Sequence, residues 1–248
     1  MNELRPFALT IAGHDPSGGA GITADVKAFE VHKVIGFSVN TGLTFQNEKE
    51  FKAINWVESE DILFQIDMLF QRHLIDHVKI GLIENLEVLN QVVDLLLDYN
   101  PSVKIIWDPI LSASAGFQFH DAIKREELFM VCEKVHLITP NIPEIESLMK
   151  RDAYEGAKEL SQFCNVLLKG GHNNDDEVKD ILFMENGSVE LAGQRSKYLK
   201  HGTGCVLSAS ITANLANGKD LESSCKDAKE YIKRFIESND SLLGWHLN

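Results

Sequence analysis

The fold class that this sequence predicts is α/β, with a mainly parallel sheet covered by helices on both faces. Short apolar runs of strand length alternate with segments whose apolar residues fall at helical spacing, as they do when helices connect parallel strands. Late in the chain, Asn186-Gly187 separates two further strand-like runs. That pair predicts a hairpin with a type I′ turn, and hence antiparallel strands at one edge of the sheet.

Six apolar runs before the hairpin are expected to form the other strands. They span residues 7–13, 36–41, 78–82, 103–107, 135–138 and 166–168. The hairpin itself joins residues 180–184 to residues 188–191. Because no long linker, repeat or low-complexity stretch interrupts this alternation, we expect residues 1–248 to form a single domain.

Helices are expected between these strands, where apolar residues recur at intervals of three and four. The segments are 22–32, 60–73, a stretch from Leu86 to at least Leu96, one from near Gly202 to Asn217-Gly218, and 221–237. Asn85 is placed to cap the third of them. Asn141 and Glu144 have the spacing of a capping box at a further helix start.

Composition excludes several classes of protein. The net charge is −13 over 248 residues, which argues against a nucleic-acid partner because duplex binding relies on Lys and Arg. No run of about 18 apolar residues is present, so no membrane segment is expected. The four cysteines are scattered, with no C-x-x-C pair, which indicates reduced thiols and a cytoplasmic location.

Four polar or glycine-rich clusters each follow a predicted strand. They are residues 13–21, 108–116, 139–144 and 169–172. Ligands of open α/β sheets bind beyond the carboxyl ends of the strands. The clusters therefore predict a binding site at that edge of the sheet. In so acidic a chain, a phosphate-bearing ligand would need locally positive surroundings there.

The strongest local signal is His201-Gly202-Thr203-Gly204-Cys205 at the start of a predicted helix. Free N–H groups and the positive end of the helix dipole can hold an anion at such a position, including a phosphoryl group in transfer. Cys205 would lie in the first turn, where a thiolate is favoured and could accept a proton. The alternative is a glycine-bearing helix entry with a buried cysteine.

Other candidates each have a structural alternative. Lys169 could reach the phosphates of ATP or be a surface lysine at a strand end. Asn141 and Glu144 could organise Mg²⁺ or only cap a helix. Asp108 could hold metal-bound water, face the phosphates or begin a turn.

Two polar residues near the amino-terminal end are further candidates. Asp25, on the first helix, could face the cleft or solvent. Gln46 follows the second strand and could hydrogen-bond the edge of a heterocycle, since an amide donates and accepts side by side.

Two nucleotide-binding motifs are missing from the chain. No G-x-x-x-x-G-K-[ST] occurs, which excludes a P-loop. No complete G-x-G-x-x-G occurs either, because Leu207 stands at the last position after Gly202 and Gly204. A dinucleotide oxidoreductase is therefore poorly supported.

Several segments in a fixed order resemble the hydroxymethylpyrimidine/phosphomethylpyrimidine kinases of the ribokinase-like superfamily. They cover nearly the whole chain: ALTIAGHDPSGGAGITAD at 8–25, KIGL at 79–82, DPIL at 108–111, TPN at 139–141 with Glu144, KGGH at 169–172 and HGTGC at 201–205. Each is modest alone, whereas the ordered set is specific.

The resemblance implies a three-layer αβα fold, often a homodimer, and two successive phosphorylations of a hydroxymethyl pyrimidine by ATP with Mg²⁺ on the route to thiamin. It also implies roles for residues of this chain. Cys205 would be the base, Gly202, Thr203 and Gly204 the anion hole, and Lys169 a phosphate contact. Asn141 and Glu144 would form a magnesium motif, Gly13, Asp25 and Gln46 would line the pyrimidine pocket, and Leu82 would close one face.

Three other functions remain open at the level of sequence. A pyridoxal or pyridoxine kinase of the same superfamily would also phosphorylate a hydroxymethyl group on a flat ring. A cysteine-dependent hydrolase would use Cys205 as nucleophile, but it would need a histidine that spacing does not identify. A nucleotide-binding protein without catalysis would need neither a phosphate acceptor nor a nucleophilic cysteine.

Overall fold

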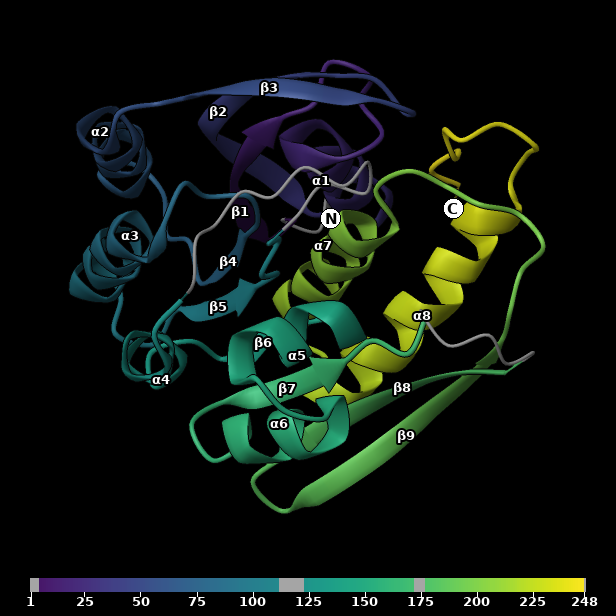
Figure 1. Cartoon of the computed structure of the whole chain (residues 1–248). Coiled ribbons are helices and arrows are strands. Elements are labelled where there is room, and N and C mark those ends of the chain that lie inside the picture. Colours follow the sequence, from purple (N-terminus) through teal and green to yellow (C-terminus); the bar gives the residue numbers. More distant parts are fainter. Residues whose placement is uncertain (1–4, 112–122, 172–176, 248) are drawn as a thin grey trace.

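The computed structural model describes residues 5–111, 123–171 and 177–247. These residues form nine strands and eight helices. All nine strands belong to one sheet, in the order β3-β2-β1-β4-β5-β6-β7-β8-β9 (Figure 1). No helix in the described ranges is both long and apolar enough to span a membrane.

The central strands are parallel, as the alternating pattern predicts. From one edge of this part to the other they are β2 (Ile35–Gln46), β1 (Phe7–His14), β4 (His77–Ile80), β5 (Lys104–Trp107), β6 (Leu137–Ile138) and β7 (Asn165–Leu168). In β1, β4, β5, β6 and β7 the interior residues are mostly apolar and buried, because helices cover both faces of the sheet there. Strand β2 instead mixes buried, half-buried and exposed residues.

Both edges of the sheet are antiparallel, whereas the sequence predicts this for one edge. The expected edge is β8 (Glu177–Met184) with β9 (Gly187–Gln194). The unexpected one is β3 (Phe51–Trp56), which pairs with a β2 that runs five residues beyond its predicted end. None of the β3 residues is buried. The strand therefore lacks the continuous apolar run that identifies the central strands.

The turn of the late hairpin differs from the type I′ prediction. Met184 pairs with Gly187, so the two loop residues are Glu185 and Asn186, and neither has a positive φ. Gly187 alone has one, at 132°. A type I′ turn requires positive φ at both loop positions, so that prediction is wrong in type and by one residue in position.

The helices form two layers (Figure 1). On one face lie α1 (Gly21–Val31), α7 (Thr203–Ala216) and α8 (Leu221–Glu237); on the other lie α2 (Ser59–Phe70), α3 (Leu86–Tyr99), α4 (Arg125–Cys132), α5 (Ile142–Met149) and α6 (Ala153–Leu160). The three-layer αβα prediction is confirmed. The eight-residue helices α4 and α6 were not predicted, because each is too short to show a clear period.

Helix caps follow the residues that the sequence singles out. The Asn85 side chain accepts a hydrogen bond from the Val88 N–H at 2.9 Å and begins α3. Asn141 and Glu144 form a reciprocal capping box at α5, with bonds of 2.9 and 2.7 Å. The capping prediction is therefore confirmed at both helices.

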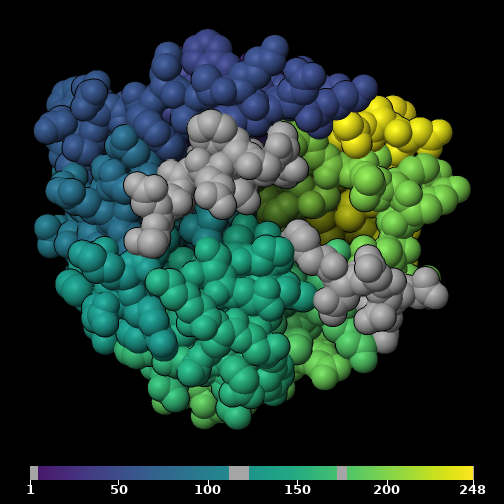
Figure 2. Space-filling view, in the orientation of Figure 1, coloured from purple at the N-terminus to yellow at the C-terminus, as the bar shows by residue number. Residues whose placement is uncertain are grey.

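The parallel strands bring their carboxyl ends to one edge of the sheet. The strand after β1 in the chain, β2, lies on one side of β1, and β4 lies on its other side, so the strand order reverses at β1. The amino-terminal end of α7 points toward the same edge. In Figure 2 the surface is hollowed below the β2–β3 hairpin, and α7 lies at the bottom of the hollow. Such a switch point is where open α/β sheets bind ligands.

The core between the sheet and α2–α6 yields a test of the packing. Leu89 on α3 is fully buried in it. We expect Leu89→Ala to lower the free energy of unfolding by about 2–5 kcal/mol, since a cavity remains where the side chain was. Urea unfolding measures this. Leu74→Ala is the matched control, because Leu74 is 79% exposed and its truncation should cost less than about 0.5 kcal/mol. Equal losses at both positions would contradict the packing.

Candidate active site

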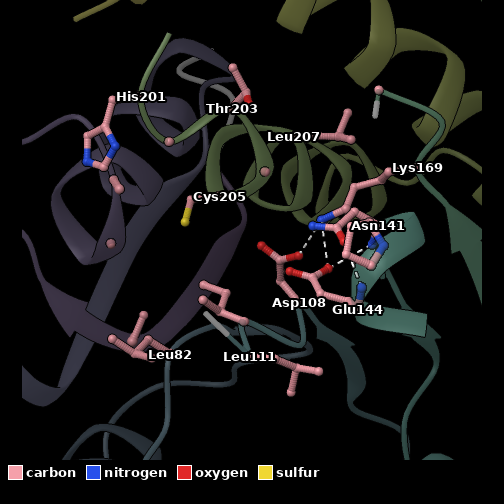
Figure 3. Close-up of a pocket in the computed structure, with 18 of the residues that line it drawn as sticks. Leu82, Asp108, Leu111, Asn141, Glu144, Lys169, His201, Thr203, Cys205 and Leu207 are labelled. Atoms are coloured by element: carbon pink, nitrogen blue, oxygen red, sulfur yellow. Dashed lines mark hydrogen bonds and ion pairs between the residues drawn. The ribbon is translucent and has the colours of Figure 1, made fainter. Parts of the chain in front are cut away.

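A cavity of about 1020 Å³ lies at the carboxyl edge of the sheet. Its walls come from the ends of β1, β2, β4, β5, β6 and β7 and from the first turn of α7. Eleven of the predicted site residues line it: Gly13, Gln46, Leu82, Asp108, Asn141, Glu144, Lys169, Gly202, Thr203, Gly204 and Cys205. In Figure 3 the charged side chains gather on one side, and Cys205 lies between them and Leu82.

The amino-terminal end of α7 opens into this cavity without a side-chain cap. Gly202 occupies the N-cap position with a φ of 78°, and its carbonyl accepts the first helical bond, from Val206. The N–H groups of Thr203, Gly204 and Cys205 have no acceptor among the backbone and side-chain groups of the described residues. These amides and the helix dipole can therefore hold an anion.

Gly202 is required by close packing as well as by its backbone angle. A Cβ at this position would lie 1.9 Å from the carbonyl oxygen of Gly19. The loop after β1 thus fixes where α7 begins, and only glycine fits there.

Lys169 shares the cavity with the α7 end. Its ammonium lies 2.8 Å from Asp108 Oδ1 and 3.9 Å from Glu144 Oε2. A Cβ built on Gly204 would stand 3.4 Å from Lys169 Nζ, so the lysine reaches the first turn of α7. Lys169 is therefore not the surface lysine of the alternative interpretation.

Asp108 is almost fully buried at the end of β5. It accepts hydrogen bonds from Lys169 Nζ, from Thr139 Oγ1 at 3.0 Å and from Ser208 Oγ at 3.3 Å. Burial alone would raise the pKa of this carboxyl, but the nearby Lys169 and Lys79 ammonium groups hold it below the ordinary value. Asp108 is therefore a fixed anion beneath the cavity.

Glu144 behaves differently from Asp108. Burial raises the pKa of Glu144 to about 7, because the Lys169 charge and the hydrogen bonds with Asn141 only partly offset it. Its Oε2 also accepts the backbone N–H of Asn141. The oxygen of the Asn141 side chain is likewise occupied, by the Glu144 N–H.

The donor set beside Lys169 fits Mg²⁺. Asp108 and Glu144 present two carboxylates to one cation, the Lys169 ammonium. No group of three or more His, Cys, Asp or Glu residues is arranged to hold a metal in the ranges that the structure covers. Mg²⁺ requires no such group, since it keeps several waters and binds through one or two carboxylates together with substrate phosphates.

Cys205 lines the cavity but is only 7% exposed. Burial raises the pKa of its thiol to about 11, and the Lys79 charge only partly offsets this. The sequence-based expectation of a favoured thiolate is wrong. The helix end and the neighbouring cation lower the cost of ionisation, but desolvation outweighs both.

A hydrogen bond that sequence reasoning missed joins the loop after β1 to the residue before the N-cap of α7. His201 Nε2 lies 2.9 Å from Asp15 Oδ2, and the Asp15 carboxylate also accepts from Ser17 and from the Ala20 N–H. Burial works against ionisation of Asp15, yet the bonds from His201 and Ser17 lower its pKa. The two partners are 186 residues apart, so no local pattern could reveal the pair.

The other half of the cavity is apolar, with amide and hydroxyl groups at its rim. Leu82 packs against Gly13, where a Cβ would lie 3.1 Å from Leu82 Cδ2. Thr44 Oγ1 donates to the His14 carbonyl at 2.8 Å, so it braces the wall. Gln46 extends from the end of β2 into the space. A flat ring fits such a slot, and the glutamine can satisfy its polar edge.

Asp25 is the one predicted site residue that does not line the cavity. Its side chain is fully buried and pairs with Lys79 Nζ at 2.7 Å. It lies behind the wall rather than in the cleft or in solvent, because residue 25 falls on the face of α1 that packs on the sheet.

Comparisons with known proteins agree with this geometry. Residues 15–247 match the model of the family described as phosphomethylpyrimidine kinase. A hydroxymethylpyrimidine/phosphomethylpyrimidine kinase of Staphylococcus aureus is 33% identical over 243 residues, which cover 93% of this chain and 88% of that protein.

Solved structures share the fold. The phosphomethylpyrimidine kinase of Clostridium difficile has a TM-score of 0.78 at 32% identity, covering 93% of this chain and 99% of that one. A pyridoxal kinase of Bacillus subtilis has a TM-score of 0.85 at 24% identity, covering 95% and 93%. At that lower identity, the likeness shows the fold alone.

The αβα fold, the open helix end and the lysine beside it define a phosphotransferase. More particularly, the chain belongs to the phosphomethylpyrimidine kinase family, since the family model spans nearly all of it.

The close packing at Gly202 can be tested against a second glycine. Gly218 also has a left-handed φ, of 85°, but no atom lies within 4 Å of its would-be Cβ. Gly218→Ala should therefore lower the free energy of unfolding by about 1–2 kcal/mol, which is the cost of the left-handed backbone alone. Gly202→Ala should lower it by at least about 1 kcal/mol more, because its Cβ would also collide with the Gly19 carbonyl. Urea unfolding of both variants measures the difference. Equal losses would mean that the loop after β1 moves aside without cost in stability.

Proposed function

We propose that this protein transfers the γ-phosphoryl group of ATP to the hydroxymethyl group of 4-amino-5-hydroxymethyl-2-methylpyrimidine, and then phosphorylates the monophosphate, in thiamin biosynthesis. The observation that carries the proposal is the uncapped α7 end facing Lys169 across one cavity. Family membership supports the substrate, because the relatives named above are kinases of this pyrimidine and its phosphate.

The two halves of the cavity suit the two substrates. The apolar slot around Gly13, Gln46 and Leu82 would hold the pyrimidine ring. The α7 amides and Lys169 would stabilise charge on the transferring phosphoryl group, which requires positioning and positive charge rather than covalent chemistry. The solved Bacillus subtilis pyridoxal kinase of the same fold is an ADP complex, which supports a nucleotide in the other half.

Mg²⁺ would be held by Asp108 and Glu144, with Asn141 supporting them as the helix cap. The ion would neutralise charge on the nucleotide phosphates. The residues of this chain supply what the ion cannot: Lys169 places a fixed ammonium, and the apolar walls exclude water that would otherwise compete as acceptor.

Cys205 would receive the proton of the substrate hydroxyl. With a thiol pKa of about 11, its own proton must first pass to solvent, so positive charge beside it has to favour the thiolate. In a loose transition state the hydroxyl is deprotonated late. The base then acts on an oxygen that is already acidic.

The alternative is a pyridoxal or pyridoxine kinase, because the fold is shared with the Bacillus subtilis pyridoxal kinase, at a TM-score of 0.85. The cysteine-dependent hydrolase has no such support. In the described residues, no histidine hydrogen-bonds to Cys205, and His201 is engaged by Asp15.

Further parts of the proposal concern the whole protein. We propose that residues 1–248 act as one domain, because a single sheet connects both helix layers. A homodimer in the cytoplasm is proposed from the family resemblance and the scattered cysteines. No nucleic acid or membrane is proposed as a partner.

A coupled ATPase assay with product analysis tests the function. The acceptors are the hydroxymethyl pyrimidine, its monophosphate, pyridoxal and pyridoxine. We expect kcat/KM to be highest for the pyrimidines, and Lys169→Met to lower turnover by about 10²–10³-fold because it removes a charge aimed at the transition state. A preference for pyridoxal would establish the alternative. ATP binding with no phosphorylated product from any of the four would exclude both kinases.

The role of Cys205 is tested by Cys205→Ala. We expect kcat to fall by about 10²–10⁴-fold, the usual contribution of a proton-transfer group, with ATP affinity changed by a small factor only. Cys225→Ala is the control, since Cys225 is equally buried but lies on α8 away from the cavity. An unchanged kcat in Cys205→Ala would remove the thiol from the reaction.

A further inference from the structure

Lys79 is a charged residue in the middle of the sheet. It lies on β4 between Val78 and Ile80, and its side chain is fully buried. Its ammonium donates to Asp25 Oδ2 at 2.7 Å, and Thr10 Oγ1 donates to the same oxygen at 2.6 Å. These residues come from three neighbouring elements, β4, α1 and β1.

Stability does not explain such a pair. Removing two charges from water costs more than their attraction usually returns, and well-packed apolar residues of similar size often do as well or better. The buried residues on either side of Lys79 are apolar, so a methionine would suit the strand. The charge therefore calls for another role.

The position of the ammonium indicates that role. Lys79 Nζ lies 2.8 Å from where a Cβ of Gly81 would stand, so the glycine leaves room for the side chain to run forward along the strand. In the part of the chain that the structure describes, only Asp25 accepts a hydrogen bond from it. The ammonium thus has N–H groups to spare, and Asp25 Oδ1 is buried without a partner.

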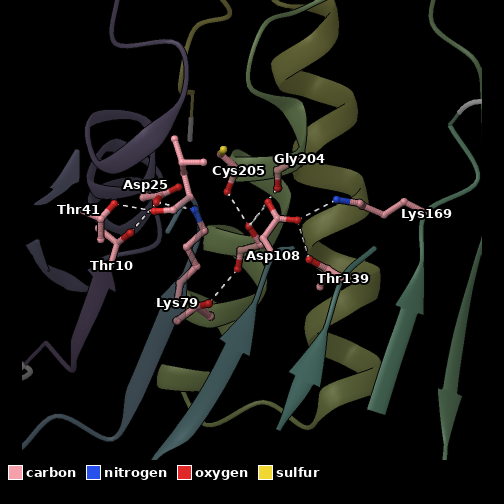
Figure 4. A network of polar contacts seen from close by, with 12 residues as sticks. Thr10, Asp25, Thr41, Lys79, Asp108, Thr139, Lys169, Gly204 and Cys205 are labelled. Atoms are coloured by element: carbon pink, nitrogen blue, oxygen red, sulfur yellow. Dashed lines mark hydrogen bonds and ion pairs between the residues drawn. The ribbon is translucent and has the colours of Figure 1, made fainter. Parts of the chain in front are cut away.

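Figure 4 shows what lies in front of this pair. Lys79 and Asp25 sit beneath the first turn of α7, next to Cys205, and Asp108 and Lys169 continue the row on the other side. α7 packs directly on β4. Two ammonium groups and two carboxylates act on the Cys205 thiol through their charge, and the Gly21 N–H donates a hydrogen bond to it. The four charged groups are Lys79, Lys169, Asp25 and Asp108.

We propose that Lys79, held in place by Asp25, is a positioning residue for phosphoryl transfer: its buried ammonium is a fixed positive charge behind Cys205 and the α7 amides. The inference rests on the proposed function for the reaction it serves. Lys169 faces the cavity, whereas Lys79 is sealed behind the wall and cannot follow a ligand. Its charge is therefore present before, during and after transfer, and it favours the thiolate of Cys205 when the hydroxyl proton is to be accepted.

The test removes both charges together, because Lys79→Met alone would strand a buried carboxylate. We expect Asp25→Asn/Lys79→Met to fold with a cooperative unfolding transition near that of the wild type. We expect its kcat to fall about tenfold or more, with both KM values within a small factor. Asp25→Asn/Lys79→Gln is the second variant, which keeps a donor and an acceptor without charge.

A second readout needs no substrate. The rate at which iodoacetamide alkylates Cys205 is followed by peptide mass spectrometry from pH 7 to 10, without nucleotide. Removal of the Lys79 charge should slow this alkylation and shift its pH profile upward. Asp180→Asn/Lys229→Met is the matched control, because Lys229 and Asp180 form another largely buried pair, at 2.5 Å; it should leave the Cys205 profile unchanged.

The outcomes separate this inference from the proposed function. A slower alkylation profile together with no product from any pyrimidine would keep the role of Lys79 and reject the substrate. A folded neutral pair with kcat and alkylation within twofold of the wild type would overturn the inference. Loss of folding in both double variants would also overturn it, since the pair would then serve stability.

Discussion

The site depends on one electrostatic constraint: a phosphoryl group must find positive surroundings in a protein whose net charge is −13. The chain meets this constraint with backbone amides rather than with a cluster of basic side chains. The α7 end supplies N–H groups that no side chain caps, and those dipoles carry no counterion and cannot be titrated. The close approach of Gly202 to the Gly19 carbonyl fixes where they point.

Buried charges of alternating sign surround this helix end. Asp25, Lys79, Asp108, Lys169 and Glu144 follow one another through the wall and floor of the cavity. Each lysine is held by at least one carboxylate, which is how a charge persists at low exposure. The row holds three carboxylates and two ammonium groups, so it adds no net positive charge, and the effect of each group depends on its neighbours.

The fold explains why such distant residues meet. Six parallel strands end at one edge, so each following loop delivers a side chain to the same cavity. The β1 loop, which must approach α7 closely, is fastened by the Asp15–His201 bond. The antiparallel β2–β3 hairpin adds the wall that carries Gln46. A single sheet thus provides one cavity with a polar half and an apolar half.

The sequence by itself determined the alternation of strands and helices, both helix caps at Asn85 and Asn141, and the glycine-rich helix entry at 202–204. These features depend on residues within a few positions of one another, where hydrogen-bonding capacity and apolar period act directly. It also placed the candidate residues at strand ends, which the parallel sheet gathers without further information. The ordered segments at 8–25 and 201–205 further indicated the family.

Only the tertiary structure decided which of the polar residues face the cavity and in what charge state. Asp25 lies on the first helix with no local sign of its burial, and its partner Lys79 is 54 residues away. The thiol of Cys205 stands at a helix end that favours ionisation, yet desolvation by the packed sheet raises its pKa to about 11. The half-exposed strand β3 shows its pairing only against β2. In each case the burial, charge state or pairing depends on contacts between segments far apart in the chain, which local sequence does not encode.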